Sequence, residues 1–240
     1  MIFAAGLGTR LGAIGRDTPK ALIEIAGQTM LERTARRLVA AGAGRIVVNV
    51  HHQADRIERF LAGRDFGAEI LVSREPERPL ETGGGLAHAR DLFRRDGPIV
   101  LHNVDVISDA DLGAMVAEHA RSGALATLAV NRRDTARYLL FDDAGLYGRE
   151  DRRHDLRREA RPPRGVTRTL AFAGIHVCAP ALLDLVTERG VFPIVEVYLR
   201  LAAEGRTIAP WLLEGRVWLE IGNLERLAAA RALLEPTAPA

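Results

Sequence analysis

The chain has little of several residue types, and each shortage excludes a class of protein. Cysteine occurs once in 240 residues, at Cys178, which excludes an internal disulfide and a cysteine-based metal cage and fits a reducing compartment. Cys178 lies in an apolar run, where a buried small side chain is expected rather than a nucleophile. The sequence shows no signal peptide and no run of about 18 apolar residues that could cross a bilayer. We therefore predict a cytoplasmic protein with no membrane partner.

An excess of charge is also lacking. Lysine and arginine total 33 and aspartate and glutamate total 31, so the formal net charge is +2. Such a small value argues against a dedicated binder of nucleic acids or membrane surfaces. The hydrophobic share of 48% and the charged share of 27% are ordinary for a globular protein. No internal repeat or linker divides the chain, so we expect one large domain over residues 1–240.

Lysine itself is almost absent, because Lys20 is the only lysine among the 33 lysine and arginine residues. A sequence that uses arginine almost everywhere keeps lysine directly after a glycine-rich stretch. A lysine ammonium is compact and mobile, whereas a guanidinium is a planar fork. We interpret Lys20 as a functional residue. The alternative is chance, because a single lysine must fall somewhere.

The chain does have a glycine-rich beginning. The apolar run 1–5 predicts a strand, and the loop behind it ends at Pro19-Lys20. Its glycines are Gly6, Gly8, Gly12 and Gly15. Glycines at a strand end let the backbone turn tightly and bring its N–H groups against a ligand. Phosphate oxygens suit these N–H groups, and Arg10 adds a cationic fork for the same partner. The stretch therefore predicts a polyphosphate-binding loop.

Segments typical of strands and helices alternate along the chain. Strands are predicted at 45–50, 69–73, 98–104 and 124–130, and helices at 30–41, 54–61 and 109–122. A continuous β-branched run such as 45–50 is typical of a parallel sheet covered by helices. Alternating strands and helices form right-handed βαβ units. We predict the α/β class, with a single Rossmann-like three-layer α/β/α domain and a mixed, mostly parallel central sheet.

The second half predicts strands at 138–141 and 169–177, helices at 180–188, 193–203 and 224–234, and a closing hairpin from 208–213 and 216–218. Residues 149–164 are dense in charge and end in two prolines, so we expect a mobile surface segment. Residues 75–88 contain three consecutive glycines, so we expect a shaped loop before a helix at 86–93. These glycines predict that a flat or bulky group approaches the backbone, and a flexible connector is the alternative.

Two acids are expected at strand ends. Asp105 follows the strand at 98–104, at the edge where open α/β sheets bind their ligands. Glu220 follows the last predicted strand. Two carboxylates above a phosphate-binding loop suit Mg²⁺, which takes few protein ligands and keeps substrate oxygens. The alternative is that Asp105 only caps the helix that follows it.

Other nucleotide-binding and catalytic motifs do not match. The dinucleotide fingerprint needs G-x-G-x-x-G and an acid at the next strand end, but the glycines lie at 6, 8 and 12 and that strand ends in Asn49-Val50-His51-His52. The lysine of a P-loop follows glycine, whereas Lys20 follows proline. No G-x-S-x-G nucleophile elbow occurs, and the seven histidines do not show metal-ligand spacing.

Five motifs together resemble the sugar-1-phosphate nucleotidyltransferases. They are AAGLGTRL at 4–11, TPKAL at 18–22, LETGGG at 80–85, N-x-D at 103–105 and WLEIGN at 218–223. Within this family the chain is most similar to N-acetylmuramate-1-phosphate uridylyltransferases and to mannose- or heptose-1-phosphate guanylyltransferases. The resemblance implies an Mg²⁺-dependent enzyme that transfers a nucleoside monophosphate from an NTP to a sugar 1-phosphate. Residues 1–130 would form the nucleotide-binding half and 131–234 the sugar-phosphate-binding half.

The resemblance also implies a role for individual residues. Arg10, Lys20 and Asp105 would be catalytic: Arg10 would hold the departing phosphates, and Lys20 would bridge the sugar phosphate and the α-phosphate. Nucleotide contacts are implied at Ala4, Ala5, Gly6, Gly8, Thr9, Arg10, Glu75, Leu80, Thr82, Gly83, Gly84 and Asn103. Sugar-phosphate contacts are implied at Lys20, Tyr138, Glu159 and Gly174. Asp105 and Glu220 would hold Mg²⁺.

Two departures from the family pattern leave alternatives open. Val104 stands where a glycine is usual, and Glu220 stands where an aspartate is usual, one methylene shorter. Mg²⁺ tolerates a displaced ligand poorly, so a catalytically weakened nucleotide-sugar sensor is a rival hypothesis. A related glycosyltransferase would carry D-x-D, which Asp105-Val106-Ile107 is not. The base, the sugar and the choice between monomer and homodimer stay open.

Overall fold

The computed structural model describes residues 1–75 and 77–235; position 76, in the expected 75–88 loop, and 236–240, in the expected domain, lie outside the described residues. The strands are β1 Ile2–Phe3, β2 Glu24–Ile25, β3 Gln28–Thr29, β4 Arg45–Val50, β5 Glu69–Arg74, β6 Ile99–Asn103, β7 Val106–Ser108, β8 Ala126–Asn131, β9 Arg137–Asp142, β10 Gly145–Asp151, β11 Leu156–Glu159, β12 Arg168–Cys178, β13 Ile208–Leu212 and β14 Trp218–Glu220. The helices are α1 Gly12–Asp17, α2 Met30–Ala40, α3 Ala54–Ala62, α4 Glu81–His88, α5 Leu112–Ser122, α6 Leu182–Leu185, α7 Ile194–Ala203 and α8 Leu224–Leu234. None of the helices in this part of the chain combines the length and the apolarity needed to traverse a bilayer.

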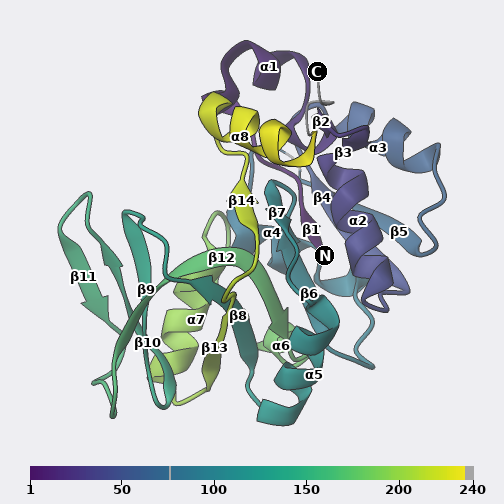
Figure 1. The fold of residues 1–240 in the computed structure, drawn as a ribbon. Helices are drawn as coiled ribbons and strands as arrows, with labels where there is room; N and C mark the ends of the chain where they lie inside the picture. Colours follow the sequence, from purple (N-terminus) through teal and green to yellow (C-terminus); the bar gives the residue numbers. More distant parts are fainter. Residues whose placement is uncertain (76, 236–240) are drawn as a thin grey trace.

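A ten-stranded mixed sheet runs through the molecule (Figure 1). Strands β5, β4, β1 and β6 are parallel, and Ile2 lies between Val48 and His102. Strand β12 joins β6 antiparallel, and β9, β10 and β11 continue from it to the edge. Strand β8 also pairs with β12 and carries β13 in parallel. The predicted α/β class and mixed central sheet are therefore confirmed.

Apolar clusters cover both faces of the parallel strands. On β4, Val48 and its neighbours at 46 and 50 point to one face and Val47 to the other, as the alternation of a strand requires. The first face packs against buried side chains of α2, α3, α5 and α8. The second packs against α4, α6 and α7. The result is the three-layer α/β/α arrangement that the alternating segments predict.

The predicted hairpin of 208–213 and 216–218 is wrong. Strand β13 pairs in parallel with β8, and β14 pairs antiparallel with β7, where Trp218 lies opposite Ser108. Each segment is an apolar run whose partner lies far earlier in the chain, so closeness in sequence gave the wrong pairing. This outcome matters for the site, because β14 carries Glu220 to β7.

The expected mobile segment at 149–164 forms ordered structure instead. Residues 156–159 pair with the end of β10 as strand β11. Arg161 binds the buried carboxylate of Asp142 at 2.7 Å, with side chains 12% and 0% exposed. The hydrogen bond from Arg161, assisted by N–H groups of Arg164 and Ala144, holds the pKa of Asp142 well below its usual range. Charge density here reflects internal ion pairing rather than a solvated loop.

Three helix boundaries also differ from the predictions. Helix α4 begins at Glu81 and contains all three consecutive glycines, so the predicted loop is shorter and the helix earlier. Helix α6 covers only Leu182–Leu185 of the predicted 180–188. The N-cap of α5 is Asp111, whose carboxylate accepts from Ala114 N at 2.9 Å, so this helix begins at Leu112 and not at the predicted residue 109.

Candidate functional site

The loop after β1 is built from close backbone packing. Gly8 and Gly12 have φ of 65° and 58°, the left-handed region that glycine adopts without strain. A Cβ at Gly15 would lie 2.2 Å from Gly8 O, so α1 rests directly on the loop backbone. A Cβ at Gly6 would meet no protein atom within 4 Å. Among the residues described, the N–H groups of 6–8 meet no acceptor, so they remain available to a ligand.

This loop opens onto a cavity of about 410 Å³ at the carboxyl ends of β1 and β6. The lining comes from the glycine loop, Lys20, Asn49, the start of α4, the turn after β6 and Gly222. The volume and the position of this cavity are typical of a small-molecule site in an open α/β sheet. A hollow of about 500 Å³ lies at the opposite ends of the strands, beside Gly44 and Gly97.

Many of the predicted site residues lie in this cavity. Those in its lining are Ala4, Ala5, Gly6, Gly8, Thr9, Arg10, Lys20, Thr82, Asn103 and Asp105. Those outside its lining are Glu75, Leu80, Gly83, Gly84, Tyr138, Glu159, Gly174 and Glu220. Residues about 100 positions apart are thus brought to one hollow, while the predicted sugar contacts beyond Lys20 are not.

Lys20 and Asp105 meet in the cavity. Lys20 Nζ lies 2.5 Å from Asp105 Oδ2, and the side chains are 11% and 18% exposed. Lys20 opens a 3-10 turn directly after the extended residue Pro19, and Asp105 occupies the turn between β6 and β7. Attraction between partly buried charges is stronger than at an exposed surface, so the pair holds the ammonium at a fixed place.

Strand β14 brings Glu220 next to Asp105. In the β7–β14 pair Glu220 lies opposite Val106, and Ile221 N donates to Asp105 O over 2.9 Å. The carboxylate of Glu220 binds Arg226 at 2.9 Å. Two strand-end acids from distant parts of the sequence therefore lie on adjacent chain segments.

Gly222 and Arg10 both lie close to the Glu220 carboxylate. A Cβ at Gly222 would lie 2.9 Å from Glu220 Oε1, so this carboxylate folds back over the turn that follows β14. Arg10 reaches within 3.6 Å of the same oxygen, although its side chain is 69% exposed. Arg10 thus lies at the cavity beside both the glycine loop and Glu220.

The chemistry of these side chains fits a hard divalent cation. Asp105 and Glu220 offer carboxylate oxygens, the ligand type that Mg²⁺ takes. Within residues 1–75 and 77–235, no group of three His, Cys, Asp or Glu side chains is placed to hold a metal. An ion here would therefore complete its coordination with water and substrate oxygens, as Mg²⁺ does in phosphate-transfer sites.

The glycines of α4 pack closely against other parts of the protein. A Cβ at Gly83 would lie 2.4 Å from the ring of Phe192, and one at Gly84 would lie 2.3 Å from Gly190 O. Both N–H groups donate to Phe192 O, at 3.0 and 3.1 Å. The bulky group expected at these glycines is therefore the segment before α7. Gly83 and Gly84 thus have a packing role, and their nucleotide contact stays a prediction.

Glu75 also takes an internal role. Its side chain is buried, Oε1 accepts from Asn49 Nδ2 at 2.6 Å, and Oε2 accepts from Leu80 N at 2.7 Å. Asn49 Oδ1 in turn accepts from Ala4 N at 2.8 Å. Because both carboxylate oxygens are used, Glu75 connects β4, Leu80 and, through Asn49, the glycine loop. The nucleotide contacts implied for Glu75 and Leu80 stay predictions.

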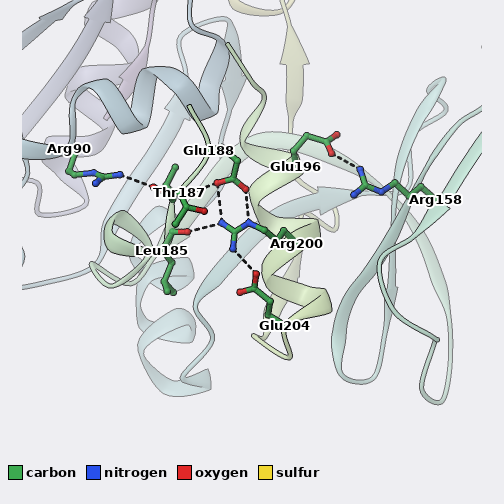
Figure 2. Close-up of polar contacts among 9 residues, drawn as sticks. Arg90, Arg158, Leu185, Thr187, Glu188, Glu196, Arg200 and Glu204 are labelled. Carbon is green, nitrogen blue, oxygen red and sulfur yellow. Dashed lines mark hydrogen bonds and ion pairs between the residues drawn. The ribbon is translucent and has the colours of Figure 1, made fainter. Parts of the chain in front are cut away.

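A polar network fixes the segment between α6 and α7 (Figure 2). Arg200 donates to both carboxylate oxygens of Glu188, at 2.7 and 3.0 Å. The same guanidinium donates to Leu185 O at 2.7 Å and to Glu204 at 2.9 Å. The network therefore holds in place the segment whose Phe192 supports α4.

Helix α7 connects the cavity to the β10–β11 hairpin. Ile194 N donates to Thr82 Oγ1 at 3.0 Å, which orients a side chain of the cavity lining. Glu196 binds Arg158 at 2.7 Å, visible in Figure 2, and also pairs with Arg149. The hairpin and the cavity wall are thus both attached to the first turn of α7.

The predicted sugar contacts lie behind the cavity or away from it. Tyr138 is buried, and its hydroxyl accepts from Thr135 N at 3.1 Å. Glu159 lies on the exposed edge strand β11. Gly174 has φ of 74°, and a Cβ there would lie 2.8 Å from Asn103 Nδ2, so it makes room for a side chain of the lining.

The sequence prediction missed several lining residues, among them Asn49, Pro79, Glu81 and Gly222. Glu81 has φ of 59°, a strained value for a residue with a side chain and one that occurs often at functional sites. Its place inside LETGGG and that of Gly222 inside WLEIGN were the available signals. Asn49 gave none, because it sits in an ordinary buried strand.

The chain is similar to known proteins along most of its length. Residues 1–236 match the family model described as nucleotidyl transferase. The N-acetylmuramate alpha-1-phosphate uridylyltransferase of Caulobacter vibrioides is 34% identical over 250 residues, covering 98% of this chain and 96% of that protein. The mannose-1-phosphate guanylyltransferase catalytic subunit beta of Xenopus tropicalis is 28% identical over 227 residues, which are 93% of this chain but 61% of that relative's length.

Solved structures share the fold. A putative glucose-1-phosphate thymidylyltransferase from Bacillus anthracis, in complex with sucrose, superposes with a TM-score of 0.81 at 18% identity, covering 100% of this chain and 96% of that one. HddC from Yersinia pseudotuberculosis gives 0.75 at 20% identity, covering 97% of both chains. At such identities the likeness is one of architecture.

Proposed function

We propose, from the premise that this chain belongs to the nucleotidyl transferase family, that it transfers a nucleoside monophosphate from a nucleoside triphosphate to a sugar 1-phosphate. The observation that carries the proposal is the meeting of three distant segments at one cavity. These are the glycine loop, the Lys20–Asp105 pair and the turn after Glu220. Together they offer N–H groups, cations and carboxylates to a polyphosphate.

The proposed reaction is attack of a sugar-1-phosphate oxygen on the α-phosphorus. A new P–O bond forms, the bond between the α- and β-phosphates breaks, and pyrophosphate leaves with the electron pair. The attacking oxygen is already anionic, so no general base is required. Catalysis then consists of positioning and charge neutralisation, as is usual for transfer at phosphorus.

Each cation has a place in this scheme. Lys20, held at 2.5 Å from Asp105, would bring its ammonium to the reacting phosphates. Arg10, exposed at the cavity, would bind the departing β- and γ-phosphates. The N–H groups of 6–8 would bind the triphosphate. When bound by Asp105 and Glu220, Mg²⁺ would add positive charge at the phosphate oxygens.

The donor and acceptor are proposed from the relatives. UTP with N-acetylmuramate 1-phosphate, or GTP with mannose 1-phosphate, are the pairs that their names suggest. The parallel part of the sheet, within 1–130, would bind the nucleotide, and 131–234 would bind the sugar phosphate. The likeness to the uridylyltransferase extends over nearly the whole of both chains, which favours the first pair.

A panel assay tests the proposal. Pyrophosphate release is measured for UTP, GTP, CTP, dTTP and ATP, each with either sugar phosphate and Mg²⁺. One pair should give release that stops with EDTA and in Lys20→Ala, but not in Arg132→Gln, a surface control that lies outside the cavity lining. Absence of release with every pair would contradict the transferase proposal.

One observation keeps the sensor hypothesis in view. Glu220 is engaged by Arg226 at 2.9 Å, and a carboxylate held there would be a poorer metal ligand. A sensor would show a rise in melting temperature with a nucleotide sugar, because a ligand bound only by the native state stabilises it, yet give no pyrophosphate. The same protein samples serve for both measurements.

A further inference from the structure

Arg133 stacks on Trp218, two residues before Glu220 on β14. The guanidinium carbon of Arg133 lies 3.8 Å from the centroid of the Trp218 ring, within the range of a cation–π contact. Residues two apart on a strand point to the same face, so the Trp218 ring and the Glu220 carboxylate share one side of β14. Arg133 thus contacts the strand at the face from which Glu220 projects.

Both members of the stack are anchored to the central sheet. Arg133 donates to Asn131 Oδ1 at 2.7 Å, on β8, and to Phe172 O at 2.8 Å, on β12. Trp218 Nε1 donates to Ala173 O at 2.8 Å, also on β12. Arg133 is partly buried, and burial lowers the pKa of its guanidinium to about 10. The negative charge of Glu220 acts in the opposite direction and raises this pKa. Arg133 therefore stays charged at neutral pH.

Strand β14 needs such an anchor. It has three residues and forms a separate two-stranded sheet with β7, outside the ten-stranded sheet. Figure 1 shows it between α8 and the central strands. Within the described residues, the bonds of Arg133 and Trp218 connect this short strand to β8 and β12.

We propose that Arg133 and Trp218 form a clamp that positions the Glu220 carboxylate for a divalent cation. The proposal rests on the proposed function, because it assigns positioning residues to the metal site of that reaction. Neither residue is a metal ligand or touches substrate in this account. The clamp acts only through the place that it gives to β14.

The sign of the effect separates the clamp from simple electrostatics. A guanidinium near Glu220 repels a divalent cation, so if Arg133 acted by charge alone, its loss would tighten cation binding. A clamp predicts the reverse, because a loosened β14 no longer holds Glu220 in register with Asp105. Trp218→Leu changes no charge and should weaken binding in the same way.

The test is a titration of the full chain with Mn²⁺ alone, followed by electron paramagnetic resonance of the free ion. Arg133→Gln and Trp218→Leu should each raise the dissociation constant about 10-fold, the lower end of what loss of an outer partner costs a metal site. Arg132→Gln is the matched control, since it removes the same charge from the neighbouring residue, whose exposed side chain pairs with Glu214. It should leave the constant unchanged.

A milder variant and two ligand variants complete the design. Trp218→Phe keeps a ring for the stack but loses the bond to Ala173, so a smaller weakening is expected even if Trp218→Leu does not fold. Unchanged or tighter Mn²⁺ binding in Arg133→Gln and Trp218→Phe overturns the clamp alone. If the wild-type protein shows no Mn²⁺ binding that Asp105→Asn and Glu220→Gln remove, the metal site of the proposed function fails, and the clamp with it.

Discussion

Two arginines show how differently the two ends of this molecule are built. Arg10, at the cavity, is 69% exposed, and its ion-pair contact with Glu220 is 3.6 Å long. Arg161, at the β9–β11 end, is 12% exposed and binds both oxygens of the buried Asp142 at 2.7 Å. The charge of Arg161 is used by the fold, whereas the charge of Arg10 is available to a ligand.

The means of support differ in the same way. The glycine loop is fixed by backbone packing, with Gly15 against Gly8, which leaves its N–H groups and side chains free to act. The hairpin end is fixed by side-chain ion pairs such as Arg161–Asp142. We therefore expect substitutions at the cavity to remove activity from a folded protein, and substitutions at the hairpin to remove stability.

The largest effect should come from the cavity. Lys20→Ala removes the ammonium that neutralises the reacting phosphates, so turnover should fall about 10³-fold, the scale of losing one well-placed charge donor. Lys20→Arg should be nearly as damaging, because a planar fork does not replace a compact ammonium. Pyrophosphate release, with circular dichroism as the folding check, measures both. Full activity in Lys20→Ala would contradict the comparison.

The hairpin end should respond in stability instead. Arg161→Ala leaves the Asp142 carboxylate buried without its partner, which should lower the free energy of unfolding by about 3 kcal/mol. Arg168→Ala is the matched control, since its pair with Asp143 is exposed and should be worth less than about 1 kcal/mol. Urea denaturation measures both. Equal effects would show that burial does not distinguish these pairs.

The packing of the glycine loop can be broken directly. Gly15→Ala places a Cβ against Gly8 O, so the loop must shift, at a cost of about 1–3 kcal/mol in stability. A shifted loop should also weaken triphosphate binding. Gly44→Ala, where a Cβ meets no atom within 4 Å, is the control. Thermal melts with and without UTP or GTP separate the two effects. An unchanged melting temperature in Gly15→Ala would contradict the close packing of Gly15 on Gly8.

The smallest effect is a pH dependence. The hydrogen bond from Arg161 lowers the pKa of folded Asp142 below the ordinary value of 3.8. The carboxylate therefore adds stability above that pH, and the contribution is lost as the pH falls below it. Asp142→Asn should reduce the acid slope of the unfolding free energy by up to about 1.4 kcal/mol per pH unit. An identical slope in the variant would contradict the assignment.

The sequence predicted those features that depend on residues close together in the chain. The family resemblance is confirmed. It was visible in the sequence because its main motif lies within residues 4–20. The parallel strands were predictable for the same reason, since runs such as Arg45–Val50 carry their own pattern. Asp105, which lines the cavity, could be proposed from the sequence because it directly follows such a strand.

The errors arose where a residue depends on a distant partner. The sequence gives no sign that Gly83 and Gly84 pack against Phe192 and Gly190, more than 100 residues later. Strand β14 was predicted to be one half of a hairpin, because β7, its partner in the structure, has only three residues. The charge-rich segment 149–164 was predicted to be mobile because the sequence does not show which arginine pairs with a buried acid.

The most direct test of the central claim follows the α-phosphorus of the donor. The protein is incubated with UTP or GTP labelled with ³²P at the α-phosphate, a sugar 1-phosphate and Mg²⁺, and the products are separated. We predict that the label enters a nucleotide sugar, and that Lys20→Ala and Asp105→Ala abolish this transfer while remaining folded. Label that stays in the triphosphate, or that appears only as free nucleoside monophosphate, would contradict the account.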